Sequence, residues 1–385
     1  MTPLRWRANL PDDARIVLIA AQSGRALASA ARRAGYVPLV ADLFGDLDTL
    51  ALAQKHVFLQ RDTDGGIARA GFGEALATLR EGLDPETILG IVCGSGFEDG
   101  VELLETAGQN APLLGNSAEI VRGLKDPLRF AKLCQTFGIA HPTITYQPPR
   151  QPAGWLVKQA GASGGGHVRA AGADDAGQSG RYFQRFVTGQ TASALFCADG
   201  RAAQIIGFSA QWTDPAPAAP FRYGGAAGPL EVAPALAAQM TKAVQAIARA
   251  RRLRGLCSAD FILDGDLAWL IEINPRPGAT LDVFDSGQTP LLHHHVTACA
   301  GTLLPLPAPA ARVRAAATIY TDKALATVPA LDWPHWSADR QRPESALTAG
   351  APVCTVLGEG ETFNEARASV TDRIAHIRTL LDGDA

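Results

Sequence analysis

The sequence predicts an α/β protein built from more than one packed unit. Three observations support this: a strand–helix–strand pattern at residues 15–42, a glycine-rich hairpin after Trp155, and an acidic hairpin at residues 255–280. The chain has 385 residues, which is too long for a single hydrophobic core, so we expect two or three units.

Composition narrows the classes of function. Hydrophobic residues make up 47% of the chain, charged residues 19%, and the formal net charge is −3 without a run of Lys or Arg, which disfavours a nucleic-acid partner. No apolar stretch reaches membrane-spanning length, and the first residues lack the apolar segment of a signal peptide. The six cysteines are scattered singly, so neither a zinc site nor a disulfide framework is indicated. We therefore expect a cytoplasmic protein without a membrane partner.

The first pattern is typical of a parallel sheet. Residues 15–21 are a buried-strand run, residues 26–35 have a helical pattern, and residues 38–42 form a second strand ending in Asp42. In such βαβ units a ligand crevice forms where the strands end.

A further strand is expected at residues 90–93, followed by a glycine-rich loop, a helix at 100–107 and a short strand at 112–115. The loops that follow these strands bring polar side chains to one edge of the sheet. The candidate substrate residues at this edge are Ser23, Arg25, Ser95 and Glu98. The alternative is that these are ordinary packing loops.

Residues 118–138 are helical, and Pro127 is expected in the first turn of a second helix. A proline-rich connector at 147–152 leads to a strand that carries Lys158 and to the glycine loop Ser163-Gly164-Gly165-Gly166. The free N–H groups of such a loop can surround phosphate oxygens. It is neither a Walker A loop nor a dinucleotide fingerprint, because no helix follows the glycines. The alternative is a mobile surface loop.

Strands are expected at 181–187, 191–197 and 203–208, then a Pro/Ala loop at 212–220 and a long helix at 236–253.

The acidic hairpin holds the strongest indication of chemistry. Two strands are joined by the turn Asp264-Gly265-Asp266, and Glu272 and Asn274 share a face of the second strand. Asp260 lies on the first strand, close enough to join them. Two carboxylates and an amide oxygen suit Mg²⁺ shared with phosphates.

Arg276 follows between Pro275 and Pro277, which stiffen its backbone. A metal site beside a fixed guanidinium indicates phosphoryl transfer. The alternative is a solvated acidic hairpin, but Glu272 ends an apolar run, where a solvated carboxylate is not expected.

Beyond the hairpin, a helix at 288–301 contains three adjacent histidines, which cannot all face one metal from a helix. A linker at 304–309 leads to strands near 313–321 and 351–357 and a final helix at 364–381.

Taken in order, these parts resemble the ATP-grasp superfamily, and most of all predicted ATP-dependent carboligases related to biotin carboxylase. The most specific segment is Glu-Ile-Asn-Pro-Arg-Pro at 272–277, with Asp260 at the matching upstream distance. The segments 351–356 and 360–366 also resemble the closing subdomain of biotin carboxylase-like proteins.

The resemblance implies an ATP-grasp fold with an N-terminal parallel α/β (pre-ATP-grasp) domain and a small C-terminal subdomain. The implied boundaries are 1–117 for the N-terminal domain, 118–190 for the small subdomain with its glycine-rich lid, 191–303 for the large subdomain with the metal site, and 304–385 for the C-terminal subdomain.

The resemblance also implies site residues. ATP with Mg²⁺, or Mn²⁺, would be the cofactor, with Asp260, Glu272 and Asn274 as metal ligands and Arg276 and Lys158 as catalytic residues. The nucleotide would contact Lys125, Lys158, Ser163, Gly164, Gly165, Gly166, Gln184, Arg185 and Val187. Gln184 stands where the family usually has a glutamate, and its amide oxygen can still accept from the adenine amino group.

The implied function is an ADP-forming carboxylate–amine ligase that acts through an acyl phosphate on a small metabolite or cofactor precursor. A bicarbonate-dependent carboxylase and a non-catalytic ATP-binding regulator are the alternatives. The intact set of Asp260, Glu272, Asn274 and Arg276 disfavours the regulator. Small-molecule substrates, a homodimer and a role in building a one-carbon carrier are further expectations.

Overall fold

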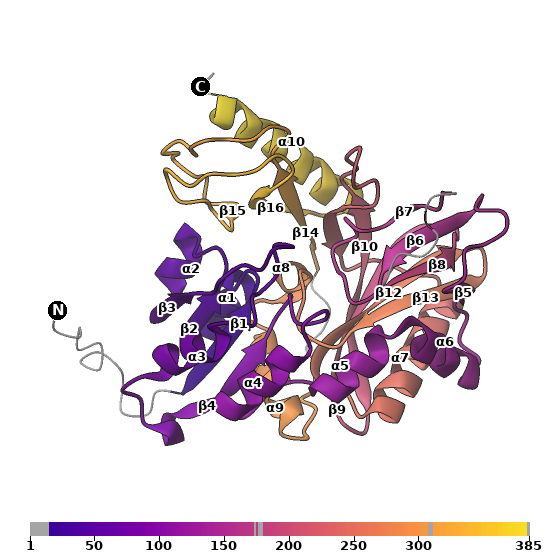
Figure 1. The fold of residues 1–385 in the computed structure, drawn as a ribbon, viewed down its shortest axis with the longest axis horizontal. Helices are drawn as coiled ribbons and strands as arrows, with labels where there is room; N and C mark the ends of the chain where they lie inside the picture. The colour runs from indigo at the N-terminus through magenta and orange to yellow at the C-terminus, as the bar shows by residue number, and fades with distance from the viewer. Residues whose placement is uncertain (1–14, 173–174, 176–179, 307–310, 383–385) are drawn as a thin grey trace.

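The structure is a computed structural model that describes residues 15–172, 175, 180–306 and 311–382. Three sheets organise the chain (Figure 1). The N-terminal sheet is parallel, in the order β3-β2-β1-β4. Its strands are β1 (Ile16–Ala21), β2 (Val37–Asp42), β3 (Lys55–Phe58) and β4 (Ile88–Cys93). The predicted parallel α/β unit is therefore confirmed.

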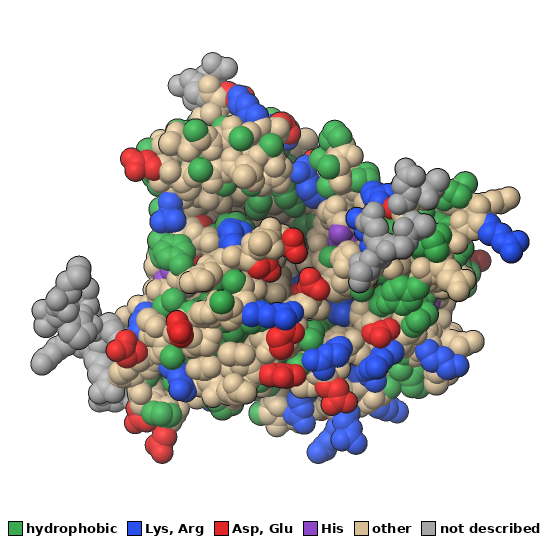
Figure 2. Space-filling view, viewed as in Figure 1, with side chains coloured by type: hydrophobic (Ala, Val, Ile, Leu, Met, Phe, Trp, Pro, Cys, Tyr) green, Lys and Arg blue, Asp and Glu red, His purple; other side chains and the backbone are tan. Residues whose placement is uncertain are grey.

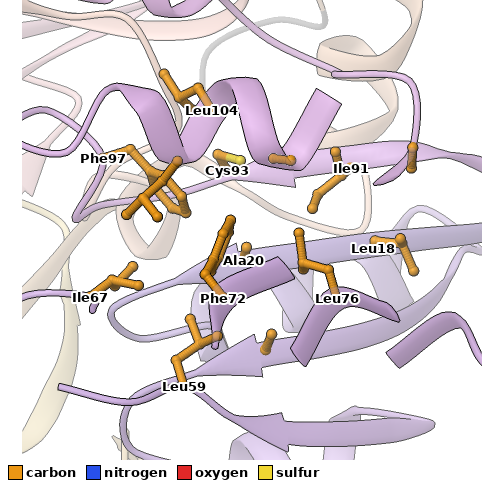
Figure 3. Packing of buried hydrophobic residues seen from close by; sticks show 14 of the residues in the cluster. Leu18, Ala20, Leu59, Ile67, Phe72, Leu76, Ile91, Cys93, Phe97 and Leu104 are labelled. Atoms are coloured by element: carbon orange, nitrogen blue, oxygen red, sulfur yellow. The ribbon is translucent and has the colours of Figure 1, made fainter. Parts of the chain in front are cut away.

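Helices cover both faces of this sheet because alternate residues of each strand point to opposite sides. Leu18 and Ala20 of β1 pack against Phe72 and Leu76 in one core cluster, which Figure 3 shows from close by. Val17 and Ile19 belong to a second cluster with α1. The helices are α1 (Arg25–Arg33), α2 (Leu47–Leu52), α3 (Phe72–Arg80) and α4 (Glu102–Asn110).

The second sheet has eight strands in the order β13-β12-β9-β10-β11-β14-β16-β15, with antiparallel neighbours. The strands are β9 (Gln190–Asp199), β10 (Ala203–Thr213), β11 (Tyr223–Gly228), β12 (Arg254–Asp264), β13 (Leu267–Asn274), β14 (Val313–Tyr320), β15 (Ser337–Ala338) and β16 (Pro352–Gly360).

Helices pack on both ends of this sheet. One core cluster joins β9, β12 and β13 to α5 (Ala118–Lys125), α6 (Pro127–Thr136) and α7 (Pro234–Arg251). Pro127 lies in the first turn of α6, as the sequence predicts, and Asp126 caps this helix. Another cluster joins β14 and β16 to the last helix, α10 (Phe363–Asp382). Two short helices, α8 (Leu281–Phe284) and α9 (Leu291–Cys299), follow β13.

A small antiparallel sheet carries the glycine loop. Its order is β5-β8-β6-β7, and the loop joins β6 to β7. The strands are β5 (Ile144–Thr145), β6 (Trp155–Gln159), β7 (Arg169–Ala170) and β8 (Arg181–Arg185). In Figure 1 this sheet lies beside the eight-stranded sheet, near β12 and β13.

Several elements differ from the sequence-based expectations. Residues 112–115 make only a single parallel bridge, Leu113 to Ile91, because Pro112 has no N–H to extend the ladder. β10 continues through Trp212 and Thr213 into the expected loop, since it pairs there with β11. The strands β3, β5, β11 and β15 and the helices α2, α3 and α8 were not predicted from the sequence.

The C-terminal segment adds strands to the eight-stranded sheet, because β11 pairs with both β10 and β14. Part of the expected linker, residues 307–309, lies outside the described residues. No helix in the described ranges is long and apolar enough to cross a membrane.

Candidate active site

The main cavity, about 1160 Å³ in volume, is lined by the glycine loop, β8, the acidic hairpin and the loops that follow β1 and β4. Figure 2 shows that this face of the molecule is hollowed below the C-terminal segment. Pockets for one small ligand usually have about 300–1,000 Å³. The cavity therefore has room for more than one small ligand.

The acidic hairpin brings its three predicted metal ligands together. Asp260 on β12 pairs directly with Glu272 on β13, and Asn274 lies two residues further on the same face. The Asn274 side-chain amide donates to Asp260 Oδ2 at 3.1 Å and to Glu272 Oε1 at 3.2 Å. The strand register thus places all three side chains in hydrogen-bonding contact.

Lys125 approaches the same group from the C-terminus of α5. Its Nζ donates to Glu272 Oε2 at 3.1 Å and to Asn274 Oδ1 at 2.6 Å. α5 ends here because Asp126 is extended and begins the cap of α6. This helix boundary points the lysine at the acidic hairpin.

The pKa values of the two carboxylates in the site shift in opposite directions. Burial raises the pKa of Asp260, and the neighbouring Glu272 carboxylate raises it further. Burial alone would also raise the pKa of Glu272, but Lys125 and Lys158 outweigh it and hold that pKa below its usual range. Burial lowers the pKa of Lys158.

This donor set fits Mg²⁺. Asp260 and Glu272 are adjacent, partly buried carboxylates that repel each other, and burial together with the Glu272 charge raises the pKa of Asp260. A divalent cation removes that repulsion, and hard cations prefer carboxylate and amide oxygens. Asp260, Glu272 and Asn274 would hold the ion; their role as metal ligands stays a prediction.

The predicted lid lies over the cavity beside Lys158. Gly164 accepts a hydrogen bond through its carbonyl from the Tyr223 N–H at 2.9 Å, which seats the loop on β11. Gly164 and Gly165 both have φ of +74°, a backbone conformation that favours glycine. Lys158 and residues Ser163 to Gly165 line the cavity. Gly166 does not appear in that lining.

The predicted base-contacting residues line the cavity as well. Gln184 is 3% exposed and shares a face of β8 with Tyr182, which also lines the cavity. Among the described residues, the Gln184 side chain has no hydrogen-bond partner. Arg185 is exposed and stacks over Trp155 at 5.8 Å, and Val187 follows in the segment after β8.

Arg276 lines the cavity beyond the acidic hairpin, next to the loop after β4. Its Nε donates to Glu98 Oε1 at 2.7 Å. The structure therefore joins one predicted substrate residue, Glu98, to the predicted catalytic arginine. Glu98 itself borders a small cavity behind Arg276 and is not part of the lining of the main cavity.

The other predicted substrate residues have different surroundings. Ser23, Arg25 and Ser95 line the main cavity, as expected for the edge of the parallel sheet. However, Arg25 is 5% exposed, and its guanidinium donates to both Asp282 and Asp339. Ser23 also donates to Asp339. These contacts tie the first βα loop to the C-terminal segment.

Two further residues reach the site without having been predicted. Gln211 on β10 donates to Asp260 Oδ1 at 3.2 Å. His167, next to the lid glycines, lines the cavity, and its Nδ1 has no hydrogen-bond partner in the described part of the chain. The position of His167 directly after three glycines was a signal in the sequence that could have placed it at the site. Gln211 gave none, because the register of β10 is set by its neighbours.

The sequence model of the ATP-grasp domain family matches residues 125–280, which include the lid, β8 and the acidic hairpin. These residues form an ATP-grasp domain. The match confirms the expected superfamily for these residues and agrees with ATP as the expected cofactor; binding of Mg²⁺ stays a prediction. No curated protein matches the chain significantly.

Solved structures show the same fold over nearly the whole chain. The biotin carboxylase of Campylobacter jejuni has a TM-score of 0.66 at 14% identity, covering 92% of this chain and 89% of its own. The biotin carboxylase domain of the Hydrogenobacter thermophilus 2-oxoglutarate carboxylase has a TM-score of 0.68 at 12% identity, covering 96% and 89%. Phosphoribosylglycinamide synthetase from Anaerococcus prevotii has a TM-score of 0.63 at 12% identity, covering 94% and 98%. These similarities show the fold that surrounds the ATP-grasp domain.

Proposed function

We propose that this ATP-grasp protein is an ADP-forming ligase that joins a small carboxylate to an amine through an acyl phosphate. The observation that carries the proposal is the continuity of the cavity. It runs from the lid and β8, past Lys125, Lys158 and the acidic hairpin, to Arg276 and the edge of the parallel sheet.

The charges along the cavity suit transfer of the ATP γ-phosphoryl group. Lys125 and Lys158 lie beside the acidic hairpin, where they can stabilise phosphate oxygens. Mg²⁺, when bound, would neutralise charge on the phosphates. Arg276 borders the adjoining space, where its guanidinium can hold a carboxylate and the transferred group.

The reaction needs this activation because a carboxylate is a poor electrophile. A carboxylate oxygen attacks the γ-phosphorus, the bond to ADP breaks, and an acyl phosphate forms. The nitrogen of the neutral amine then attacks the acyl carbon, the C–O bond to phosphate breaks, and the nitrogen releases a proton to solvent. Amide, ADP and phosphate are the products.

The lid can protect the intermediate. An acyl phosphate reacts with water, so the loop at Ser163–Gly166 would close over the phosphates before transfer. The hydrogen bond from the Tyr223 N–H to the Gly164 carbonyl supports this proposal, because it holds the loop against β11 beside the cavity.

One assay tests the proposal. Purified protein with Mg²⁺ and ATP is incubated with pooled carboxylates and amines, with and without bicarbonate, and ADP and phosphate are measured. We expect ADP and phosphate only when a carboxylate and an amine are both present. ADP that depends on bicarbonate alone would support the carboxylase alternative instead, and release of AMP with pyrophosphate would contradict both.

A further inference from the structure

The loop between β4 and α4, residues 94–101, reaches Arg276 from the parallel sheet. Phe97 anchors this loop: it is 3% exposed and packs edge-to-face on Phe72 with ring centroids 5.8 Å apart. Figure 3 shows Phe97 among the core side chains of this sheet. The next residue, Glu98, is thereby held at the boundary between the parallel sheet and the ATP-grasp domain.

Both carboxylate oxygens of Glu98 are used within the protein. Oε1 accepts from Arg276 Nε at 2.7 Å, and Oε2 accepts from the backbone N–H groups of Gly96 and Phe97, each at 3.1 Å. The side chain is 3% exposed and does not line the main cavity. Burial alone would raise the pKa of Glu98, but Arg276 and Lys125 outweigh burial and lower it, which keeps the carboxylate charged.

Arg276 is fixed at two further points. The side-chain amide of Asn116 donates to the Pro275 carbonyl at 2.9 Å, which holds the backbone before Arg276. Nη1 donates to the Pro277 carbonyl at 3.2 Å. Among the described residues, Nη2 has no hydrogen-bond partner. The guanidinium is therefore held by its Nε side, and Nη2 stays available to a ligand.

We propose that Glu98 is a positioning residue, which orients the Arg276 guanidinium toward the transferred phosphoryl group and does not itself contact substrate. This inference rests on the proposed function, since it assumes that Arg276 acts in phosphoryl transfer. A long arginine side chain loses rotamer freedom when it binds an anion, and an arginine that is already fixed avoids that loss. The loop after β4 then belongs to the catalytic machinery although it lies outside the ATP-grasp domain.

The test uses Glu98→Gln, because the amide has nearly the shape of the carboxylate. Its NH₂ group would face either Arg276 Nε–H or the two backbone N–H groups, so at least one donor loses its acceptor. Arg276→Met and the double variant complete a mutant cycle. Glu102→Gln on the neighbouring α4 is the matched control, since Glu102 is partly exposed and pairs with Arg69 at the surface.

The probe is Mg-ADP with aluminium fluoride, which mimics the transferring phosphoryl group and needs no knowledge of the substrate. Nucleotide retained after gel filtration measures the complex, calorimetry measures binding of Mg-ADP alone, and thermal unfolding measures stability. We expect Glu98→Gln to lower retention of the complex at least about ten-fold with Mg-ADP affinity unchanged. The double variant should be no worse than Arg276→Met, and Glu102→Gln should behave as wild type.

Unchanged retention in Glu98→Gln would overturn the inference. Two other results would also overturn it. One is a double variant whose loss of retention equals the product of the two single losses, and the other is a loss of retention in Glu98→Gln with an equal loss of Mg-ADP affinity. Either result would indicate a purely structural contact. If Glu98→Gln does not fold, Glu98→Asp, which keeps the charge but shortens its reach, is expected to give the same selective loss. Wild-type protein that binds neither Mg-ADP nor its aluminium fluoride complex would overturn the proposed function itself.

Discussion

Glu272 and Asp260 face each other across two strands, yet their pKa values shift in opposite directions. The difference comes from the lysines. Lys125 contacts Glu272 directly, whereas Asp260 receives hydrogen bonds from the neutral amides of Gln211 and Asn274. One carboxylate of the pair is therefore stabilised by a neighbouring charge, and we predict that the other is stabilised by a cation that binds with the nucleotide.

We predict that Glu272→Gln lowers turnover at least roughly 100-fold while the fold survives, because the amide removes one negative charge from the metal site. Turnover measured over a range of Mg²⁺ concentrations checks this, and the apparent Mg²⁺ requirement should rise. Asp264→Asn is the control, since Asp264 is exposed at the end of β12, the strand that pairs with the one carrying Glu272. Turnover that is equal in wild type and Glu272→Gln would remove Glu272 from the metal site.

His295 illustrates a buried neutral side chain. It is 1% exposed, its Nδ1 accepts from the Leu256 N–H at 2.9 Å, and its Nε2 lies 3.0 Å from the Leu114 carbonyl, to which it can donate. Burial lowers the pKa of His295 to about 4 from an ordinary value of 6.5, although the contact with Leu114 opposes the change. The three adjacent histidines thus include one with a clear packing role.

This burial predicts a loss of stability in acid. Between pH 6.5 and 4 the unfolded state binds a proton at His295 that the folded state does not. The free energy of unfolding therefore decreases as the pH falls through this range. Between pH 7 and 5 the cost is about 2 kcal/mol. Unfolding free energies at both pH values check this: His295→Gln should lose about 2 kcal/mol less than wild type over that range. His335→Gln, at an exposed position, should lose as much as wild type.

At the scale of elements, the conformation of the glycine loop between β6 and β7 depends on the backbone freedom of its glycines. Gly165 has φ of +74°, and a Cβ there would lie 2.0 Å from the Phe221 carbonyl oxygen. Gly166 has no such restriction, because a Cβ there would meet no atom within 4 Å. A side chain therefore fits at Gly166 but not at Gly165.

We predict that Gly165→Ala displaces the lid from its seat, whereas Gly166→Ala leaves it in place. A side chain in the left-handed region costs about 1–2 kcal/mol, which corresponds to an ATP affinity about five- to thirty-fold weaker. Titration calorimetry with Mg-ATP checks both variants. Equal affinities in the two would show that this loop conformation does not contribute to nucleotide binding.

At the scale of the whole molecule, one buried ion-pair network ties three segments together. Arg25 of α1 donates to Asp282 on α8 and to Asp339 after β15, and Asp339 also accepts from Thr355 on β16. The Asp48 carboxylate accepts from the backbone N–H of Asp339 at 2.9 Å. The parallel sheet, the helix α8 that follows the ATP-grasp domain, and the C-terminal segment meet here.

We predict that Arg25→Met destabilises the protein by about 3–5 kcal/mol, because it leaves buried carboxylates without their counter-charge. Arg69→Met is the control: its partner Glu102 is 38% exposed and Arg69 is 72% exposed, so less than about 1 kcal/mol should be lost. Chemical denaturation of both variants measures the difference. Similar losses would show that the network contributes little beyond a surface ion pair.

The sequence by itself determined the features that depend on neighbouring residues. The alternation around Glu272 and Asn274, the Asp264–Asp266 turn, Pro127 at a helix start and the strand–helix–strand pattern at 15–42 are local, and the structure contains all four. Local patterns persist because backbone geometry and side-chain periodicity act over a few residues.

Only the tertiary structure decided which distant residues meet. The contacts of Glu98 with Arg276, Arg25 with Asp339, and Gln211 with Asp260 join positions far apart in the chain. Strand register and the packing of whole segments set these contacts, and neither leaves a local signal in the sequence. The prolines on either side of Arg276 predict a stiff backbone there, but no local pattern indicates that Glu98 holds its side chain.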